Sequence, residues 1–233
     1  MPFFNIIYVE NVEKATSLVV DNLEEELKSG NLNSLGLATG STMIPFYTSI
    51  VETNLDFSQV IAFNLDEYVG LDPSHKNSFA FFMHEHLFSK KHFKETNIPN
   101  GLSLDKKLEC ARYEKKLDEH PIDIQLLGVG ENGHIAFNEP GTPFDALTHV
   151  AELSDSTVHV NSQYFEANEN MPTQAFTMGI ASILKAKKII LLAFGEKKRA
   201  AIDALLGDNI TEQWPITVLK KHPHVTLITN IKR

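Results

Sequence analysis

Short apolar runs alternate along the chain with longer segments in which apolar residues recur every three or four positions. The short runs have the length of strands, and the spacing in the longer segments is that of one buried helix face. We expect strands at residues 5–9, 35–38, 60–65, 122–127, 187–194 and 224–229. Apolar strands separated by helices are typical of parallel βαβ units. The pattern therefore predicts an α/β fold: a doubly wound, mainly parallel sheet with helices on both faces.

Glycine and proline mark where the predicted helices begin and end. The apolar spacing over residues 12–27 predicts a helix that stops at Gly30, and Pro45 fits the first turn of the next helix. Further helices are expected around residues 79–87 and 110–117. Another is expected after the strand at 187–194, with Ile202, Leu205 and Leu206 facing inward and Gly207 as its stop. Cys110 lies on the apolar face of one of them, so we interpret it as a core residue rather than a nucleophile.

The composition is that of a globular protein, because 42% of the 233 residues are hydrophobic and 22% are charged. No repeat, low-complexity tract or linker divides the sequence, so we expect a single domain over residues 1–233. The single cysteine excludes an intrachain disulfide.

The charge balance argues against polyanionic partners. The formal net charge is −9, and no basic block is present, so we expect neither nucleic acid nor a membrane as partner. No apolar run approaches the ~20 residues that cross a bilayer. The first residues lack the pattern of a signal peptide, and we expect a cytoplasmic protein.

Four expected strands are followed by unusual polar sequences. These are Thr39-Gly40-Ser41-Thr42, Asp66-Glu67-Tyr68, Gly130-Glu131-Asn132-Gly133-His134 and Gly195-Glu196-Lys197-Lys198. Ligands of doubly wound sheets bind beyond the carboxyl ends of the strands. The four sequences are therefore expected to converge on one active site.

The Gly40-Ser41-Thr42 segment has two interpretations. A glycine turn that delivers Ser and Thr to a helix start offers backbone N–H groups, hydroxyls and a positive dipole end to a phosphate. The alternative is an ordinary cap, with Ser41 or Thr42 as the N-cap residue. A Walker loop is excluded because no Gly-Lys-Ser/Thr follows.

Residues 128–133 match the dinucleotide pattern G-x-G-x-x-G after an expected strand. That pattern needs a helix to begin at the glycines, and Pro140-Gly141 would end any helix within two turns. We therefore reject a dinucleotide site. The segment instead places His134 near Glu139, a carboxylate that can orient an imidazole for proton transfer.

Asp66 and Lys198 each have a functional and a structural interpretation. Asp66 ends an apolar strand, where desolvation would make its carboxylate a usable base, but it could also cap the next element. Lys198 lies at a helix start, which suits a cation only if it binds an anion; the alternative is a solvated lysine. We expect no metal site, because the His-x-His pairs at 84–86 and 222–224 lack ligand spacing and further ligands.

Three longer motifs follow one another in a recognisable order. They are Leu35-Gly36-Leu37-Ala38-Thr39-Gly40-Ser41-Thr42, Phe63-Asn64-Leu65-Asp66-Glu67-Tyr68-Val69-Gly70-Leu71 and Gly128-Val129-Gly130-Glu131-Asn132-Gly133-His134-Ile135-Ala136-Phe137-Asn138-Glu139-Pro140-Gly141. Together they resemble the glucosamine-6-phosphate deaminase (glucosamine-6-phosphate isomerase) family, in its short-tailed bacterial form. The resemblance implies conversion of glucosamine 6-phosphate to fructose 6-phosphate and ammonia without a cofactor. It further implies a cytoplasmic hydrolase of amino sugar metabolism, in N-acetylglucosamine catabolism.

The resemblance also implies roles for residues of this sequence. Asp66 would remove the C2 proton of the open-chain sugar and deliver it to C1. His134 would open the pyranose ring, oriented by Glu139 and accompanied in the catalytic loop by Asn132. The residues that would hold the phosphate are Thr39, Gly40, Ser41, Thr42 and Lys198.

Two positions depart from the family pattern. Asn132 stands where many members have Asp, so Glu139 would be the main carboxylate partner of His134. Gln163 stands where the family has an Arg associated with the substrate phosphate, and its loss should weaken anion binding.

The polar residues 154–172 resemble the mobile lid of the family. The chain also lacks the longer tail of allosteric, oligomeric relatives beyond Arg233. From this resemblance we expect little activation by N-acetylglucosamine 6-phosphate and a monomer or small homo-oligomer.

Two other functions compete with the deaminase. A 6-phosphogluconolactonase-like hydrolase shares the fold, but it would leave Asp66 without a task, and lactonases tend to be apolar where Glu139 stands. A non-catalytic sugar-phosphate sensor is favoured only by Gln163, and we see no room for a DNA-binding module before Leu35.

Overall fold

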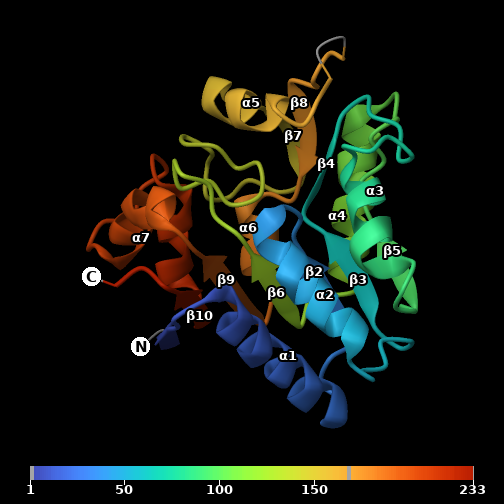
Figure 1. Ribbon diagram of the computed structural model, residues 1–233. Coiled ribbons are helices and arrows are strands. Elements are labelled where there is room, and N and C mark those ends of the chain that lie inside the picture. Colours follow the sequence, from blue (N-terminus) through green and yellow to red (C-terminus); the bar gives the residue numbers. More distant parts are fainter. Residues whose placement is uncertain (1–2, 167–168, 233) are drawn as a thin grey trace.

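The computed structural model describes residues 3–166 and 169–232, and within them seven strands form one parallel sheet (Figure 1). The strand order is β1-β10-β9-β6-β2-β3-β5, and every neighbouring pair is parallel. The strands are β1 (Phe3–Tyr8), β2 (Ser34–Leu37), β3 (Ile61–Asn64), β5 (Glu95–Asn97), β6 (Ile124–Leu127), β9 (Lys188–Ala193) and β10 (His224–Thr229). The predicted doubly wound α/β fold is therefore confirmed.

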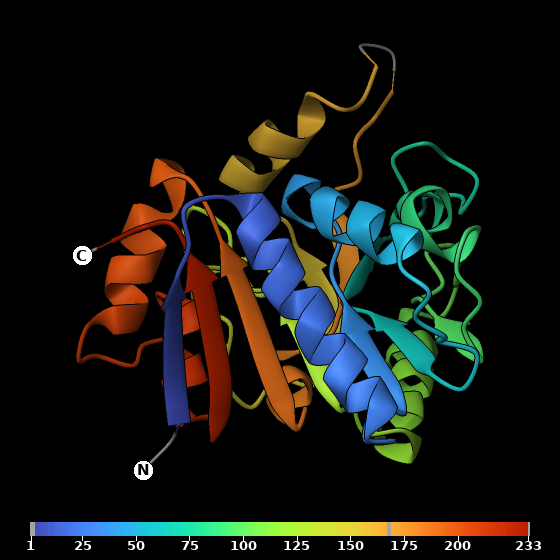
Figure 2. The same ribbon diagram turned by 60° about the horizontal axis from the view of Figure 1, so that its bottom comes forward.

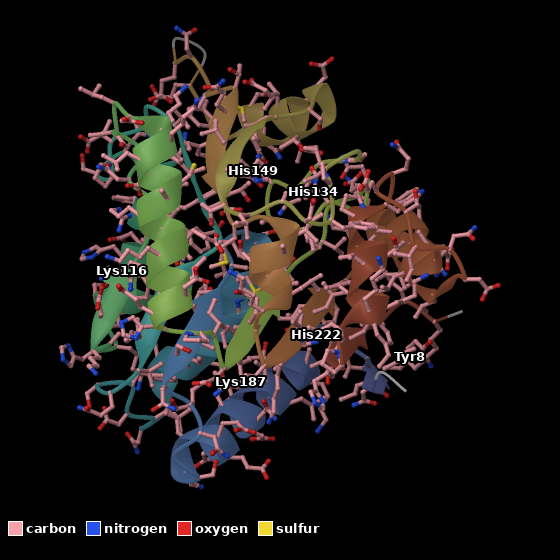
Figure 3. All side chains as sticks on the ribbon, turned by 180° about the vertical axis from the view of Figure 1, so that it is seen from behind. Tyr8, Lys116, His134, His149, Lys187 and His222 are labelled. Carbon is pink, nitrogen blue, oxygen red and sulfur yellow. The ribbon has the colours of Figure 1, made fainter. Side chains whose placement is uncertain are left out.

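Helices cover both faces of this sheet. The α-helices are α1 (Val12–Lys28), α2 (Ile44–Glu52), α3 (Phe79–Met83), α4 (Lys106–Glu119), α5 (Asp155–Ser162), α6 (Ile180–Leu184) and α7 (Arg199–Leu206). Figures 1 and 2 show α1 and α2 on one face, and Figure 3 shows α4 and α6 on the other. In α1, a buried stripe of Ala15, Val19 and Leu23 faces the sheet, as helical spacing predicts.

Shorter helical turns complete the set of helices. They are the 3₁₀ turns Ser41–Met43, Glu196–Lys198 and Pro215–Lys221, and a π-helical turn at His84–Phe88. The helix expected over residues 79–87 is therefore α3 continued by a π turn. Within the described residues, no helix is long and apolar enough to cross a membrane.

A second, antiparallel sheet was not predicted. It has the order β4-β8-β7, with β4 (Asp66–Tyr68), β8 (Gln174–Thr177) and β7 (His149–Glu152). One residue from each of its strands, Tyr68, Ala151 and Ala175, forms a separate apolar cluster with Phe137 and Leu153. These strands are too short for an alternating pattern to stand out, and each pairs with a strand that is distant in sequence.

Cys110 is half-buried at the margin of the core rather than inside it. Burial raises the pKa of its thiol to about 11, and Glu109 adds to the effect. A thiol with so high a pKa is a poor nucleophile, which agrees with a structural role. The same helix contributes Tyr113 and Leu117 to the core, as expected.

Candidate active site

The four polar sequences follow four adjacent strands, β9, β6, β2 and β3. In chain order, the strands after β2 are added first on one side, as β3 and β5, and then on the other, as β6 and β9. The reversal between β2 and β6 is the topological switch point at which such sheets bind ligands. Figure 3 shows His134 at this end of the molecule, opposite Lys187 and His222.

Asp66 begins β4 at the point where the chain leaves the main sheet. The preceding Leu65 donates its N–H to Leu37 O (3.1 Å) and accepts from Met178 N (2.7 Å), which anchors the junction. Asp66 is only 6% exposed. Burial raises the pKa of its carboxyl group to about 8, and the neighbouring Glu67 adds to the shift.

Glu67, rather than Asp66, is the structural carboxylate of this pair. Its two oxygens accept hydrogen bonds from the N–H groups of Tyr68 (2.8 Å), Phe79 (3.0 Å) and Ala80 (2.8 Å). It therefore serves the start of α3, the capping role that was the alternative for Asp66. In the part of the chain that the structure describes, the Asp66 carboxyl group accepts no hydrogen bond, so it is free to act on a ligand.

The loop after β6 is shaped around the His134 ring. Gly130 N–H donates to His134 O (2.9 Å), and Gly133 adopts a positive φ of 83° at the turn. A Cβ atom on Gly130 would lie 2.4 Å from His134 Nδ1, so only glycine leaves room for the imidazole. No helix follows in the described residues up to 148, so the context of a dinucleotide site is missing.

Glu139 faces His134 across this loop. The distance from His134 Nδ1 to Glu139 Oε2 is 3.5 Å, and Nδ1 is buried without a hydrogen bond to any described residue. Asn132 Nδ2 donates to Glu139 Oε2 (2.8 Å), and Asn132 Oδ1 accepts from His134 N (3.2 Å). Thr157 Oγ1 donates to the other oxygen, Oε1 (2.5 Å).

These contacts decide the charge of Glu139. Burial raises the pKa of its carboxyl group, but the neighbouring His134 and the hydroxyl and amide donors outweigh it and lower the pKa to about 2. Glu139 is therefore ionised at neutral pH, as an orienting partner of an imidazole must be. Asp66 and Glu139 thus have pKa values displaced in opposite directions, an arrangement typical of acid–base sites.

The turns after β2 and β9 have the same backbone structure. Gly40 (φ 100°) precedes the 3₁₀ turn Ser41–Met43, and Gly195 (φ 86°) precedes the 3₁₀ turn Glu196–Lys198. Neither turn is capped by a side chain, so the expected alternative of Ser41 or Thr42 as N-cap is wrong. The N-cap of the 3₁₀ turn is Gly40, which leaves the Ser41 and Thr42 hydroxyls available to a ligand.

Lys198 differs from the basic residues beside it. Lys197 lies 3.8 Å from Glu131, and Arg199 pairs with Glu196 at 2.5 Å. For Lys198, burial lowers the pKa, opposed by the more distant Glu131, and no ion pair forms with any described residue. A half-buried, unpaired ammonium group at this edge of the sheet is suited to an anion.

The segment that was predicted as a lid contains α5. Gln163 at its end is exposed, and its Nε2 donates back to Val160 O (2.7 Å) rather than toward the sheet. Asn161 donates to the Tyr68 hydroxyl (3.0 Å). Residues 167 and 168 of the predicted 154–172 segment lie outside the described residues.

The structure joins the two candidate acid–base groups through β8. Thr177 is the register partner of Asp66, and its Oγ1 accepts a hydrogen bond from Phe137 N (3.1 Å) in the His134 loop. Asn138 Nδ2 adds a second tie by donating to Met178 O (2.8 Å). Sequence reasoning missed Thr157 and Thr177, because nothing local distinguishes these two threonines from others.

No group of three or more His, Cys, Asp or Glu side chains is placed to hold a metal ion, as far as the described residues go. The His-x-His pair at 84–86 lies in the π turn, where the His86 ring packs at 4.4 Å against Phe82.

Comparison with known proteins gives one family over nearly the whole chain. Residues 9–228 match the family described as glucosamine-6-phosphate isomerases/6-phosphogluconolactonase. A glucosamine-6-phosphate deaminase of Listeria monocytogenes serotype 4b (strain CLIP80459) is 51% identical over 223 residues, covering 96% of this chain and 95% of the relative. One from Streptococcus agalactiae serotype III (strain NEM316) is 48% identical over 225 residues, covering 97% and 96%.

Solved structures agree at the level of the fold. A monomeric glucosamine-6-phosphate deaminase superposes with a TM-score of 0.91 at 38% identity, covering 97% of this chain and 96% of that one. A 6-phosphogluconolactonase from Trypanosoma brucei has a TM-score of 0.79 at 18% identity, covering 98% and 97%. At that identity the second likeness shows the shared fold alone.

The expected hydrolase class is wrong. The similar relatives are deaminases, and the family description groups such enzymes with isomerases, so the chemistry is an isomerising deamination. The match over residues 9–228 and the identity of about half to curated relatives show that this chain belongs to the family of glucosamine-6-phosphate isomerases and 6-phosphogluconolactonases.

Proposed function

We propose that this protein is an enzyme that converts glucosamine 6-phosphate to fructose 6-phosphate and ammonia. The observation that carries the proposal is the buried Asp66 carboxyl group, which accepts no hydrogen bond from any described residue and lies beside the His134–Glu139 loop. The deaminase relatives at 48–51% identity support the choice of substrate.

Ring opening comes first and uses His134. The imidazole removes the proton of the C1 hydroxyl and returns a proton to the ring oxygen, which frees an aldehyde at C1. Glu139 carries the negative charge that stabilises the imidazolium form between these two transfers. Asn132 has no charge of its own and holds Glu139 and the loop backbone in place.

Isomerisation follows and uses Asp66. Its carboxylate removes the C2 proton of the open-chain sugar while the C1 oxygen gains a proton, which gives an enolamine. The same carboxyl group then returns the C2 proton to C1, the nitrogen gives up one proton, and C2 becomes an imine carbon. Water then replaces nitrogen at C2 and ammonia leaves. These steps transfer protons and water only, so we propose that no redox cofactor takes part.

Phosphate binding orients the substrate for both steps. We assign it to Thr39, Gly40, Ser41 and Thr42 after β2 and to Lys198 after β9. The uncapped turn supports this assignment, and so does the Lys198 ammonium group, which forms no ion pair with a described residue. Gln163 lacks the charge of the family Arg, so Lys198 and the turn would carry the anion between them.

We further propose that the chain forms one catalytic domain and that residues 154–172 act as its lid. The protein would act on a sugar phosphate as a monomer or small homo-oligomer. It would have neither nucleic acid nor a membrane as partner. A monomeric relative with a TM-score of 0.91 supports the small assembly. A 6-phosphogluconolactonase or a non-catalytic sensor is less well supported, because the lactonases compared share only the fold at 18–21% identity and the relatives near 50% identity are deaminases.

The test is the release of ammonia and fructose 6-phosphate from glucosamine 6-phosphate, compared between wild type and Asp66→Asn. We expect equal amounts of both products from the wild type, and a loss of about 10²-fold or more in kcat without the base. Asp208→Asn, which removes an exposed carboxylate, is the matched control and should be unchanged. Equal turnover by wild type and Asp66→Asn would show that Asp66 is not the base.

A further inference from the structure

The two oxygens of the Glu139 carboxylate are held from different parts of the chain. Oε2 accepts from Asn132 (2.8 Å) and faces His134 Nδ1 at 3.5 Å, both in the same loop. Oε1 accepts from Thr157 Oγ1 (2.5 Å), which belongs to α5. The carboxylate is thus oriented between its own loop and a helix that follows 18 residues later in the chain.

Thr157 itself is fixed at the start of α5. It is only 6% exposed, and its Oγ1 accepts from the hydroxyl of Ser154 (3.1 Å), the N-cap residue. The Ser154 hydroxyl in turn accepts from Thr157 N (3.3 Å). The single proton of the Thr157 hydroxyl is therefore directed at Glu139.

The helix α5 also touches the segment that carries Asp66. Asn161 donates to the hydroxyl of Tyr68 (3.0 Å), two residues after Asp66, and the Phe165 ring packs edge-on against the Tyr68 ring at 6.1 Å. The position of α5 is therefore connected to both candidate acid–base groups.

The hydroxyl of Thr157 matters because the His134–Glu139 contact is incomplete. His134 Nδ1 is buried and without a hydrogen bond to any described residue, so a small rotation of the carboxylate decides whether the contact forms. With Oε1 unheld, the carboxylate would be anchored by Asn132 alone, and a buried oxygen would lose its donor. The imidazole would then lose its oriented partner.

We propose that Thr157 is a positioning residue for ring opening, which holds Glu139 and through it the His134 ring, so that the placement of α5 controls this step. The inference rests on the proposed function for its kinetic half. Its structural half concerns the His134 ring alone and can be tested in the free protein.

The experiment compares Thr157→Val, which keeps the shape and removes the hydroxyl, with Thr157→Ser, which keeps the hydroxyl. Thr142→Val is the matched control, because Thr142 Oγ1 donates to the backbone oxygen of the same Glu139 (2.7 Å) and not to its carboxylate. Thr157→Ala serves in case the valine variant does not fold, which thermal unfolding of each protein checks.

Two quantities are measured on every variant: the ring ¹⁵N chemical shifts of His134 at fixed pH, assigned with His134→Asn, and kcat and KM for glucosamine 6-phosphate. We expect Thr157→Val and Thr157→Ala to move the His134 shifts and to lower kcat about tenfold, with KM within about twofold. Thr157→Ser and Thr142→Val should resemble the wild type in both quantities.

Either change without the other overturns the inference. A loss of kcat with unmoved His134 shifts would mean that Thr157 only packs α5, and moved shifts with full kcat would mean that the contact does not serve the reaction. A wild type that produces no ammonia would refute the proposed function, whereas unmoved His134 shifts in Thr157→Val would refute the contact independently of it.

Discussion

Asp66 and Glu67 are adjacent carboxylates with opposite surroundings. Glu67 accepts three backbone N–H groups, whereas the Asp66 carboxyl group is buried and meets no donor among the described residues. Desolvation without compensation raises the pKa of Asp66 to about 8 and makes it the stronger base of the two candidates in this region. A chain pattern can place both residues at a strand end, but only the contacts distinguish them.

The raised pKa of Asp66 predicts how activity depends on pH. The base must be ionised to take the C2 proton, so kcat/KM should rise with pH up to about 8. The measurement is a pH profile of ammonia release, with Asp66→Glu as the comparison, because the longer carboxyl group should keep a rising limb at lower kcat. A profile that is flat between about pH 6 and 9 would contradict the assignment.

The same shift predicts how stability depends on pH. The pKa of Asp66 is higher in the folded state than its unfolded value of 3.8, so the folded state binds the proton more tightly. The contribution of Asp66 to the stability of the fold is therefore present at low pH and is lost as pH rises through about 8. Asp66→Asn should therefore raise the Tm, and the gain should be larger near pH 9 than near pH 5. Thermal unfolding at both pH values measures it, with Asp208→Asn as the control.

Among the elements, the site is made of segments that follow parallel strands, and the turns after β2, β6 and β9 each depend on a glycine. Gly40 and Gly195 adopt positive φ before 3₁₀ turns, and Gly130 leaves the space that the His134 ring fills. The polar sequences after β2, β3, β6 and β9 could be predicted to converge, because adjacent parallel strands end at one edge. The short strands β4, β7 and β8 could not be predicted, because their pairing depends on residues distant in sequence.

The loop after β6 predicts a selective effect of glycine substitution. Gly130→Ala places a Cβ atom 2.3–2.4 Å from the His134 ring, which must shift, and we expect kcat to fall about 10²-fold. Gly128→Ala is the control, because its nearest neighbour to a new Cβ is Met43 Cε at 3.9 Å. Equal rates for the two variants would show that the ring position is not critical.

The turn after β9 predicts a difference between two neighbouring lysines. Lys198→Gln should raise KM for the sugar phosphate about tenfold or more, because the half-buried ammonium group has no carboxylate partner in the described chain. Lys197→Gln should change KM by less than about twofold, because that side chain is exposed beside Glu131. A KM that changes in Lys197→Gln and not in Lys198→Gln would contradict this prediction.

Across the whole molecule, two sheets must be held in one arrangement for the Asp66 strand and the His134 loop to lie side by side. Thr177 and Asn138 tie the His134 loop to the small sheet, and Glu114 ties α4 to the start of β7 and to α6. The Glu114 carboxylate accepts from Thr148 N (3.1 Å), Ser182 Oγ (2.7 Å) and Lys185 Nζ (2.9 Å). This buried network joins the small antiparallel sheet, whose strand β4 carries Asp66, to helices that pack on the seven-stranded sheet.

Glu114→Gln should lower the free energy of unfolding by about 2 kcal/mol, because charged hydrogen bonds to a buried group are lost. Burial raises the pKa of Glu114, but the hydrogen-bond donors around the carboxylate outweigh burial, so the pKa is lowered in the folded state. The contribution of Glu114 to the free energy of unfolding is therefore present above the unfolded pKa and is lost as pH falls through the lower, folded pKa. Urea unfolding near pH 7 measures the difference, and Glu119→Gln, at an exposed position on the same helix, should be neutral.

Local spacing and glycine and proline chemistry were enough to predict six strands of the seven-stranded sheet, the helices α1–α4 and α7, and the polar segments after four strand ends, whereas β5 and α6 were not predicted. The sequence also determined the family, through motifs that keep their order. The folded structure was needed to show that Glu67 and not Asp66 has backbone donors, that Ser41 and Thr42 are not caps, and that Thr157 donates to Glu139. Those outcomes depend on burial and on contacts between residues far apart in the chain, which no local pattern contains.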